Sequence, residues 1–581
     1  MNKQDFYDRF KRLLENTKER YELDTLHDAL IMWFGEYYLS LDPDDIKERI
    51  VNDRCAEGVD AVLIDQINYN LFFVQAKTVE NFNNTKNNLS ETAIKSTLAG
   101  IEFLLKSDYR VEEVKCNQVK AKFHLLKIPT QKVAIIWINL PQTFRLGEEL
   151  EIELTYRGKP EGPLSYINKE GAELDIYGLW YPLTGLEDFF TARQRLVVPK
   201  GQRSLGNGKL VEVIKGKQND TYIFESKTPL VVMNFASSDF KYSSKEVGNK
   251  KFEFFYSPSY SKFISQIKAE LPGILKFYQE KFGDYDHNLL RVIEIQSPNQ
   301  SAYSSLLNVI IHSSFLDSLS KEKDLVYQEK RLYHLLAHEV SHQWWGNQAA
   351  PKVLNGGWWL VEGLAEYSSL LALENKYGEE ELKRTVIKSE LKGYQDYLKK
   401  HEDKALNIAS FFEGYSGSLF YYKGSLVFHM LRYLVGQEDF EQILRLYFER
   451  FCFKFADIDD FQKICEEICQ KDLDWFFNQW LRSSKKLDFK VWSIKLKRDS
   501  KDNVTTEVTI KNLGEVVWQA PVEVLIETEK GKEIRKWELK KKINKIELET
   551  TSLVKSITLD PNFWLLDFNR DNNYLSVRRE I

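Results

Sequence analysis

A chain of 581 residues is too long for one hydrophobic core, so we expect three or four domains. Apolar residues make up 43% and charged residues 29% of the chain, which excludes global disorder, and the net charge of -5 argues against a dedicated nucleic-acid or anionic-membrane protein. The five cysteines are few and scattered, and no segment approaches the roughly 18 uncharged apolar residues that cross a bilayer, so we expect a cytoplasmic protein with no disulfides and no membrane part.

The first region, residues 1–112, is mostly helical in its pattern. Apolar residues recur with helical spacing at 5–21, 26–41 and 92–105. Between the second and third of these segments, residues 58–77 show two short apolar runs on either side of a polar turn, which predicts a β-hairpin.

Three further regions follow along the chain. Residues 113–250 read as short strands punctuated by Gly and Pro, which predicts a mostly antiparallel β domain. Helical periodicity dominates residues 251–484. Alternation returns in residues 485–581, as expected for a small β-sandwich. The sequence therefore predicts a multidomain α+β protein whose largest domain is helical.

The segment 338–342 reads H-E-V-S-H and supplies the first candidate metal site. On a helix, His338 and His342 share one face, so both imidazoles can point at one ion. Glu339 lies beside them and can reach a water on the metal without being a ligand. The alternative is a buried helix that carries these residues by chance, and the apolar run before the motif supports the helix in both cases.

A second segment, 358–367, begins another amphipathic helix and contains Glu362 and Glu366. Catalytic zinc takes three protein ligands and leaves one position open for water or substrate. Glu362 completes such a set, so we predict one zinc ion per chain held by His338, His342 and Glu362. Glu366 follows one helical turn later, and we interpret it as a partner that orients a ligand, with a plain surface carboxylate as the alternative.

The segment F-Y-Y-K-G at 420–424 offers a third element. A tyrosine hydroxyl can donate a hydrogen bond to the oxyanion of a tetrahedral intermediate. From spacing alone, Tyr421 and Tyr422 are better explained as core aromatics. His334, one turn before the motif, could be offered as a further ligand, but Glu362 already fills that place, so we expect His334 to pack or to face solvent.

These segments together resemble the gluzincin aminopeptidases, the family of aminopeptidase N. The matching residues are H-E-V-S-H-Q-W-W-G-N at 338–347, V-E-G-L-A-E-Y at 361–367 and Y-Y-K-G at 421–424. The resemblance implies a thermolysin-like, mostly helical catalytic domain, a peptide or protein substrate and the general-base role for Glu339. The family's transition-state tyrosine precedes x-K-G, which carries that role over to Tyr421.

The sequence departs from the family pattern in three ways. Nineteen residues separate His342 from Glu362, one more than is usual, which resembles a permease-associated branch of the family. The start of the β domain is shortened. The family's G-x-M-E-N strand, whose glutamate grips the substrate's free α-amine, is replaced by S-A-Y-S-S at 301–305, with Ser304 in the place of the glutamate.

Because Ser304 cannot pair with an ammonium, we expect an enzyme that does not select free N-termini and that cleaves internal bonds or one special substrate. Its nearest acidic neighbours in the sequence, Glu294 and Asp317, are each about ten residues away or more. The alternative is that Glu366 or another carboxylate substitutes for the missing glutamate.

Residues 1–112 resemble a different fold, the PD-(D/E)xK nuclease core in the variant with Gln before x-Lys. This resemblance implies an α/β domain in which Asp60 and Gln75 could hold a magnesium ion, Lys77 could polarise the attacking water and Glu36 could add a carboxylate. Residues 1–115 hold 15 Lys and Arg against 22 Asp and Glu, a poor surface for nucleic acid. A small helix-and-hairpin domain without activity is the alternative.

The function that we predict from the sequence is zinc-dependent peptide hydrolysis. One rival is a phage-defence or restriction-type nuclease whose peptidase domain is regulatory or recognises a partner. Another is a scaffold whose zinc is only structural. Glu339 and Tyr421 speak against both rivals, because neither rival needs a base or an oxyanion donor.

Overall fold

The structure of this chain is a computed structural model. The chain divides into two compact units, residues 1–99 with 142–149 and residues 100–141 with 150–581. The residues that the structure describes are 61–65, 70–74, 98–128, 133–144, 148–159, 165–175, 178–183, 187–297, 302–352, 356–409, 416–498, 504–550 and 552–577.

The first unit contains an antiparallel hairpin of strands β1 (Ala61–Asp65) and β2 (Asn70–Val74). This hairpin was predicted from the two apolar runs around a polar turn, and it is confirmed. The residues of the possible nuclease-like site lie outside the described residues: Glu36, Asp60, Gln75 and Lys77.

Strand β3 (Leu98–Lys106) stands where helical spacing predicted a helix, so that prediction is wrong for these residues. The side chains of Phe103 and Leu105 are buried and Ile101 is partly buried in the same core, which is the two-residue period of a strand with one face covered. A short apolar run fits both periods, and pairing with a later strand decides between them. The β region therefore begins at β3, before residue 113.

Antiparallel sheets make up the β region. Their strands alternate buried and exposed positions in places, as in β11, where one face packs on a core and the other meets solvent. In the order of neighbours within each sheet, the strands are β3, β7 (Val133–Phe144) and β6 (Lys122–Ile128); β5 (Val119–Lys120), β4 (Arg110–Cys116) and β8 (Ile152–Arg157); β12 (Arg203–Leu205), β15 (Phe235–Ser238), β10 (Gly171–Leu174) and β9 (Tyr166–Ile167); and β11 (Phe190–Pro199), β14 (Asn219–Leu230) and β13 (Lys209–Lys215).

A five-stranded mixed sheet opens the helical region. Its central strands β17, β18 and β20 run parallel, whereas β16 and β19 pair antiparallel at the two edges. The edge strand β19 lies in contact with the long helix α6. The bounds are β16 (Lys241–Val247), β17 (Lys250–Tyr256), β18 (Leu289–Ile295), β20 (Asn308–His312) and β19 (Ala302–Ser305).

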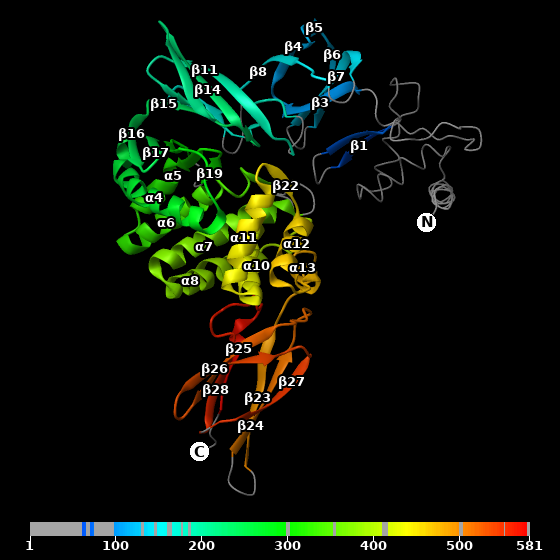
Figure 1. The fold of residues 1–581 in the computed structure, drawn as a ribbon, viewed down its shortest axis with the longest axis vertical. Coiled ribbons are helices and arrows are strands. Elements are labelled where there is room, and N and C mark those ends of the chain that lie inside the picture. Colours follow the sequence, from blue (N-terminus) through cyan, green and yellow to red (C-terminus); the bar gives the residue numbers. More distant parts are fainter. Residues whose placement is uncertain are drawn as a thin grey trace, which may run out of the picture. The chain divides into compact units, whose positions relative to one another are not determined.

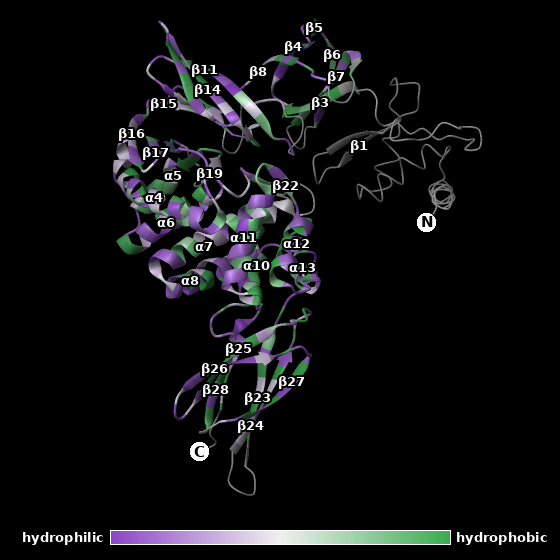
Figure 2. Ribbon diagram, viewed as in Figure 1, coloured by the Kyte–Doolittle hydropathy of each residue, from purple (hydrophilic) through white to green (hydrophobic). Residues whose placement is uncertain are grey.

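Helices form the rest of this region and share one hydrophobic core (Figures 1 and 2). Helix α6 packs against α4 and α7, and α10 packs against α7 and the π-helical turn η4. The bounds are α4 (Ser261–Phe282), α5 (Ser313–Ser320), α6 (Leu325–Ser341), η4 (Trp359–Gly363), α7 (Leu364–Tyr377), α8 (Glu379–Thr385), η5 (Val386–Leu391), α9 (Lys392–Leu398), α10 (Ser416–Val435), α11 (Gln437–Phe451), α12 (Ile458–Cys469) and α13 (Asp474–Trp480). A short parallel pair, β21 (Ala349–Pro351) and β22 (Lys454–Ala456), joins the loop after α6 to the segment before α12.

Two sheets close the chain, as the alternation near the C-terminus predicted. Along β25 every second side chain is buried, and those buried residues join the same core as residues of the other sheet. The sheets are β23 (Phe489–Arg498), β24 (Val504–Asn512) and β27 (Ile543–Glu549), and β26 (Lys532–Glu538), β25 (Pro521–Thr528), β28 (Val554–Leu559) and β29 (Tyr574–Ser576). Throughout the described ranges, no helix has the length and apolarity needed to cross a membrane.

Candidate active site

Helix α6 carries the histidine motif into the core. Asp324 caps its first turn by accepting hydrogen bonds from two backbone N–H groups, which stabilises the end remote from the motif. Near the other end, the Tyr278 hydroxyl of α4 donates to the carbonyl oxygen of Ala337 at 2.9 Å. His338 and His342 are therefore held at the buried C-terminal end of the helix, where His342 is the capping residue.

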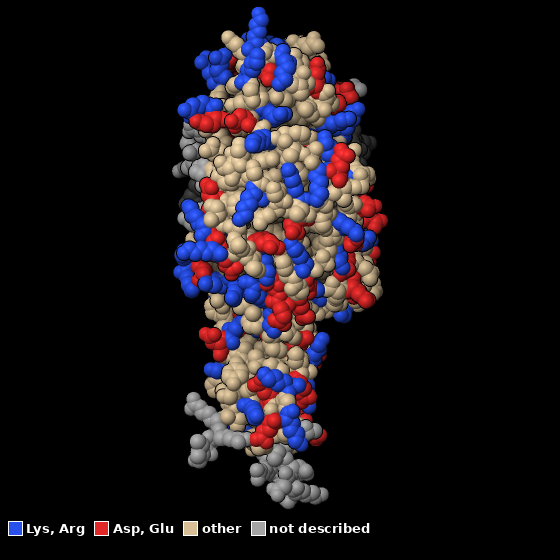
Figure 3. Space-filling view, turned by 90° about the vertical axis from the view of Figure 1, so that its left-hand side faces the viewer, with Lys and Arg blue, Asp and Glu red and all other residues tan. Residues whose placement is uncertain are grey.

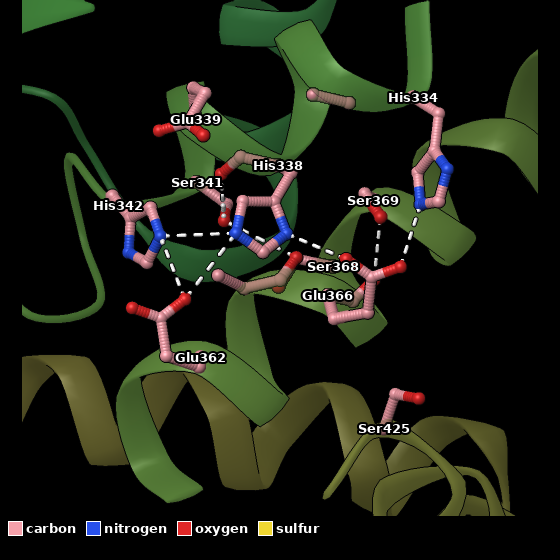
Figure 4. A network of polar contacts seen from close by, with 12 residues as sticks. His334, His338, Glu339, Ser341, His342, Glu362, Glu366, Ser368, Ser369 and Ser425 are labelled. Carbon is pink, nitrogen blue, oxygen red and sulfur yellow. Dashed lines mark hydrogen bonds and ion pairs between the residues drawn. The ribbon is translucent and has the colours of Figure 1, made fainter. Parts of the chain in front are cut away.

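Three donor atoms converge beside this helix end (Figure 4). The Nε2 atoms of His338 and His342 lie 3.2 Å apart, and Oε2 of Glu362 lies 3.6 Å from each of them. Zinc bonds of about 2.0–2.2 Å in a tetrahedron separate two ligand atoms by about 3.3–3.6 Å. The three atoms therefore have the spacing of three corners of a zinc tetrahedron.

The outer nitrogens of both imidazoles are occupied, which directs the inner nitrogens at the common point. His342 Nδ1 lies 3.0 Å from the carbonyl oxygen of Trp345, which can only accept, so Nδ1 carries the proton. His338 Nδ1 lies 2.8 Å from Oε2 of Glu366 and donates to it in the same way. In the neutral rings, both Nε2 atoms then present lone pairs to the same place, as metal-binding histidines do.

The carboxylate of Glu362 fits the same purpose. Its Oε2 is buried and accepts no hydrogen bond from the described residues, an arrangement that is costly unless a cation satisfies the oxygen. Burial alone would raise the pKa of Glu362, but the two histidines lower it well below its usual range. The charged form is thus favoured, and the donor set of two neutral imidazoles and one carboxylate suits zinc.

Close backbone contact between η4 and α10 fixes Glu362. A Cβ atom on Gly363 would lie 2.9 Å from a ring carbon of Trp359, 3.1 Å from the carbonyl oxygen of Phe420 and 3.2 Å from the carbonyl carbon of Gly424, so any larger residue would require these neighbours to shift. Trp359 stacks on Phe428 with ring centroids 4.2 Å apart and donates its indole N–H to Gly424 at 3.1 Å. Glu362 lies within the π-helical turn, a local distortion that is frequent at functional sites.

The two tyrosines of α10 face different surroundings. The ring of Tyr421 lies against the imidazole of His338, with centroids 5.5 Å apart. Tyr422 packs against Gly393 of α9, and it is half-buried. The structure therefore brings Tyr421, and not Tyr422, into contact with the histidine pair.

Glu366 joins two histidines of α6. Its Oε2 lies 2.8 Å from Nδ1 of His338 and its Oε1 lies 2.9 Å from Nε2 of His334 (Figure 4). Burial would raise the pKa of Glu366, but His334 and His338 together lower it well below its usual range. His334 is thus a partner of Glu366, outside the set of three converging donors.

Glu339 lies on the other side of the two imidazoles from Glu362 in the view of Figure 4. Its side chain is 4% exposed, and burial raises its pKa, an effect that the neighbouring histidines partly oppose. The hydroxyl of Ser304 lies 3.0 Å from Oε2 of Glu339. Sequence reasoning placed Ser304 beside the substrate but missed this contact, because no local pattern encodes the approach of an edge strand to a helix.

The three converging donor atoms have the chemistry and spacing of a gluzincin-type zinc site. Residues 269–480 match the sequence model of the peptidase family M1 domain, in agreement with the resemblance of the three motifs to the family of aminopeptidase N.

The matched relatives are aminopeptidases and M1 metallopeptidases. Probable aminopeptidase 2 of Sulfurisphaera tokodaii is 28% identical over 171 residues, which are 28% of this chain and 21% of that protein. Aminopeptidase A of Legionella pneumophila, solved in complex with aspartic acid, shares the fold with a TM-score of 0.64 and 16% identity, covering 81% of this chain and 55% of that one. The M1 zinc metallopeptidase of Deinococcus radiodurans has a TM-score of 0.54 and 17% identity, covering 67% and 87%.

The aligned segment thus spans about a fifth of the length of the first of these relatives. The comparisons give no support to the alternative nuclease function or to magnesium. On the face that Figure 3 shows, basic and acidic side chains are interspersed, and neither sign covers a large area.

Proposed function

We propose that this chain is a zinc-dependent metallopeptidase in which His338, His342 and Glu362 hold one zinc ion. The observation that carries the proposal is the convergence of two imidazole nitrogens and an unpartnered buried carboxylate oxygen at mutual distances of 3.2–3.6 Å. A zinc ion bound there acidifies water and polarises a peptide carbonyl.

Glu339 is the proposed general base. It lies next to His338 in the chain, and its raised pKa suits a carboxylate that takes a proton from water and later gives it to the leaving amine. Tyr421, whose ring lies against His338, is the proposed hydrogen-bond donor to the oxyanion that develops on the peptide carbonyl. Glu366 holds the His338 ring in the orientation that keeps its Nε2 directed at the metal.

The proposed enzyme does not depend on a free N-terminus of its substrate. Ser304, in the place of the family's amine-binding glutamate, carries no charge, and its hydroxyl already contacts Glu339. Both oxygens of Glu366 have histidine partners, so Glu366 is poorly suited to replace that glutamate. The two acidic residues nearest to Ser304 in the sequence have protein partners of their own: Glu294 accepts from the backbone N–H of Ser257, and Asp317 accepts from the hydroxyl of Tyr260.

The substrate is a peptide or protein, as the family and its relatives suggest; a variant of the Deinococcus radiodurans enzyme was solved with a Tyr-Ser-Ala substrate. The cysteines in the described part of the chain are free thiols, in keeping with the proposed cytoplasmic setting. The division into an N-terminal domain, a β domain, a catalytic domain and a β-sandwich remains our proposed organisation, with the start of the β domain moved from residue 113 to strand β3.

The test combines metal analysis with one pair of substrates. We expect about one zinc per chain, and hydrolysis that a chelator abolishes and zinc restores. Tyr-Ser-Ala and its N-acetylated twin should be cleaved at rates within about tenfold of each other, because Ser304 carries no charge to pair with the free amine. A zinc-free protein, or a zinc-loaded one without hydrolysis, would refute the proposed activity. A preference for the free amine well above about tenfold would refute only the proposed selectivity.

A further inference from the structure

Strand β19 meets helix α6 through one side chain. The Oγ atom of Ser304 lies 2.8 Å from the backbone carbonyl oxygen of Glu339 and 3.0 Å from its side-chain oxygen Oε2. Both neighbours are acceptors, so the single hydroxyl proton is shared between them. Through these two contacts, Ser304 restrains the Glu339 side chain relative to the backbone of Glu339.

A second contact holds this strand in register along the helix. Gln343, two residues beyond the end of α6, accepts from the backbone N–H of Leu307 at 2.8 Å and donates to the carbonyl oxygen of Ser305 at 3.1 Å. Ser305 is the last residue of β19, and Leu307, with a φ of 72°, lies in the turn that leads to β20. The position of Ser304 against Glu339 is therefore set by the backbone of a tight turn that is clamped by Gln343.

The hydrogen bond to Oε2 leaves the other carboxylate oxygen free for a different task. Within the part of the chain that the structure describes, Ser304 is the hydrogen-bond donor to the Glu339 carboxylate. A glutamate side chain has three rotatable bonds, and a base must be held within a fraction of an ångström and about 10–20° of its productive orientation. A donor on one oxygen supplies that restraint.

We propose that Ser304 is a positioning residue for catalysis: it holds Oε2 of Glu339 so that Oε1 faces the water to be activated. The inference rests on the proposed function of Glu339. Ser304 stands where the family has a substrate-binding glutamate. Under this proposal its hydroxyl orients the general base and does not bind the substrate.

The neighbouring serine provides a matched control. Ser305 is fully buried and its hydroxyl bonds Asn234 at 2.6 Å and Asn207 at 3.1 Å, on the face of β19 away from Glu339. Removal of either hydroxyl deletes one oxygen from the same strand. A purely structural effect of the strand would appear in both variants, whereas an effect on the base would appear in one.

The experiment measures kcat, KM, zinc content and Tm of the full chain with Ser304→Ala, Ser304→Thr and Ser305→Ala. The substrate is the better of Tyr-Ser-Ala and N-acetyl-Tyr-Ser-Ala, or casein if neither is cleaved. Ser304→Ala should lower kcat by roughly 10–100-fold, the usual effect of one hydrogen bond to a charged group, with KM and zinc content within about twofold. Ser304→Thr, which keeps the hydroxyl, should recover most of the loss.

Ser305→Ala should lower Tm and leave kcat within about threefold of the wild-type value, because its partners are remote from the base. If Ser304→Ala is too unstable to assay, Ser304→Cys keeps the volume but donates only weakly, and it should show the same fall in kcat. In a Glu339→Asp background, whose shorter side chain withdraws from Ser304, the Ser304→Ala change should have little further effect.

The outcomes separate the inference from the function on which it rests. A zinc-loaded wild-type chain without hydrolysis would overturn the proposed function and the role of Ser304 with it. An active wild-type chain whose kcat is unchanged by Ser304→Ala would overturn the inference alone. Equal losses of kcat in Ser304→Ala and Ser305→Ala would do the same, since they would trace the effect to the strand and not to the base.

Discussion

The two sides of the site differ in how their polar groups are arranged. On the donor side, α6, η4 and α7 supply His338, His342, Glu362 and Glu366, and each imidazole has an outer partner that aims its inner nitrogen. On the strand side, β19 supplies one uncharged hydroxyl that contacts Glu339. The donor side brings together the four side chains that the sequence predicted for a metal site, whereas the described residues of β19 include no acidic group.

This difference separates two requirements of a peptidase. Holding a metal and activating water requires the donor side and the base. Selecting one end of a peptide requires a charge placed on the strand side. Under the proposed function, this chain keeps the first set of groups and not the second, so we expect hydrolysis that does not depend on a free N-terminus. Four measurements can break or sharpen the comparison, and they follow from the largest expected effect to the smallest.

His342→Ala should remove most of the bound zinc and abolish hydrolysis, because it deletes one of three donors. Zinc content measured by mass spectrometry checks the loss. The matched variant His334→Ala should keep its zinc, since His334 contacts Glu366 and lies outside the donor set. Full zinc occupancy in His342→Ala would show that His342 is not a metal ligand and would refute the proposed set of three donors.

Glu339→Gln should keep zinc and Tm while lowering kcat by roughly 10²–10⁴-fold, because the amide preserves the shape but cannot accept a proton from water. Steady-state kinetics and zinc analysis on the same sample check this expectation. Activity within a few-fold of the wild type would show that another group is the base.

Tyr421→Phe should lower kcat by roughly 10²–10³-fold if the hydroxyl stabilises an oxyanion, with little change in zinc content. Tyr422→Phe serves as its control, since Tyr422 packs against Gly393 and should tolerate the loss. A larger loss in Tyr422→Phe would mean that the roles of the two tyrosines are reversed.

Glu366→Ala should weaken zinc binding by roughly 10–100-fold, because His338 loses the partner that orients its ring. Competition with a chromogenic chelator measures this affinity. Glu374 lies on the same helix and pairs with Arg432 at 2.7 Å, so Glu374→Gln should leave zinc affinity unchanged. Equal zinc affinities in Glu366→Ala and the wild type would show that Glu366 does not orient His338 for metal binding.

The residues of the donor side could be predicted from the sequence because the two histidines are close together in the chain. Positions i and i+4 of a helix share a face, so His338 and His342 could be paired from the sequence alone, and the facing Glu362 followed from the ligand count of catalytic zinc. The chemical roles of these residues remain predictions until the variants are measured. The predicted strands and hairpin were confirmed wherever the chain alternates clearly, as in β24 and β25.

The rest depended on contacts between distant segments. Residues 98–105 carry an apolar run that fits a helix or a strand, and pairing within the β3-β7-β6 sheet makes it a strand. The contact between Ser304 and Glu339 needs the register of an edge strand along a helix, and Gln343 sets that register through a turn. No periodicity in the sequence reports such a contact. Glu36, Asp60, Gln75 and Lys77 lie outside the described residues, so the nuclease-like site stays a prediction.

The close approach of Gly363 to Gly424 restricts which substitutions this chain can accept during evolution. Glu362 and Tyr421 are on two elements that touch through backbone atoms, so a methyl group added at Gly363 would press on the backbone of α10 and push apart the elements that carry the proposed metal ligand and the proposed oxyanion donor. Most buried positions accept gradual exchange of one apolar side chain for another. At Gly363 and Gly424 even a methyl group would require the neighbouring atoms to shift, so substitution at these two positions is more constrained than in the surrounding core.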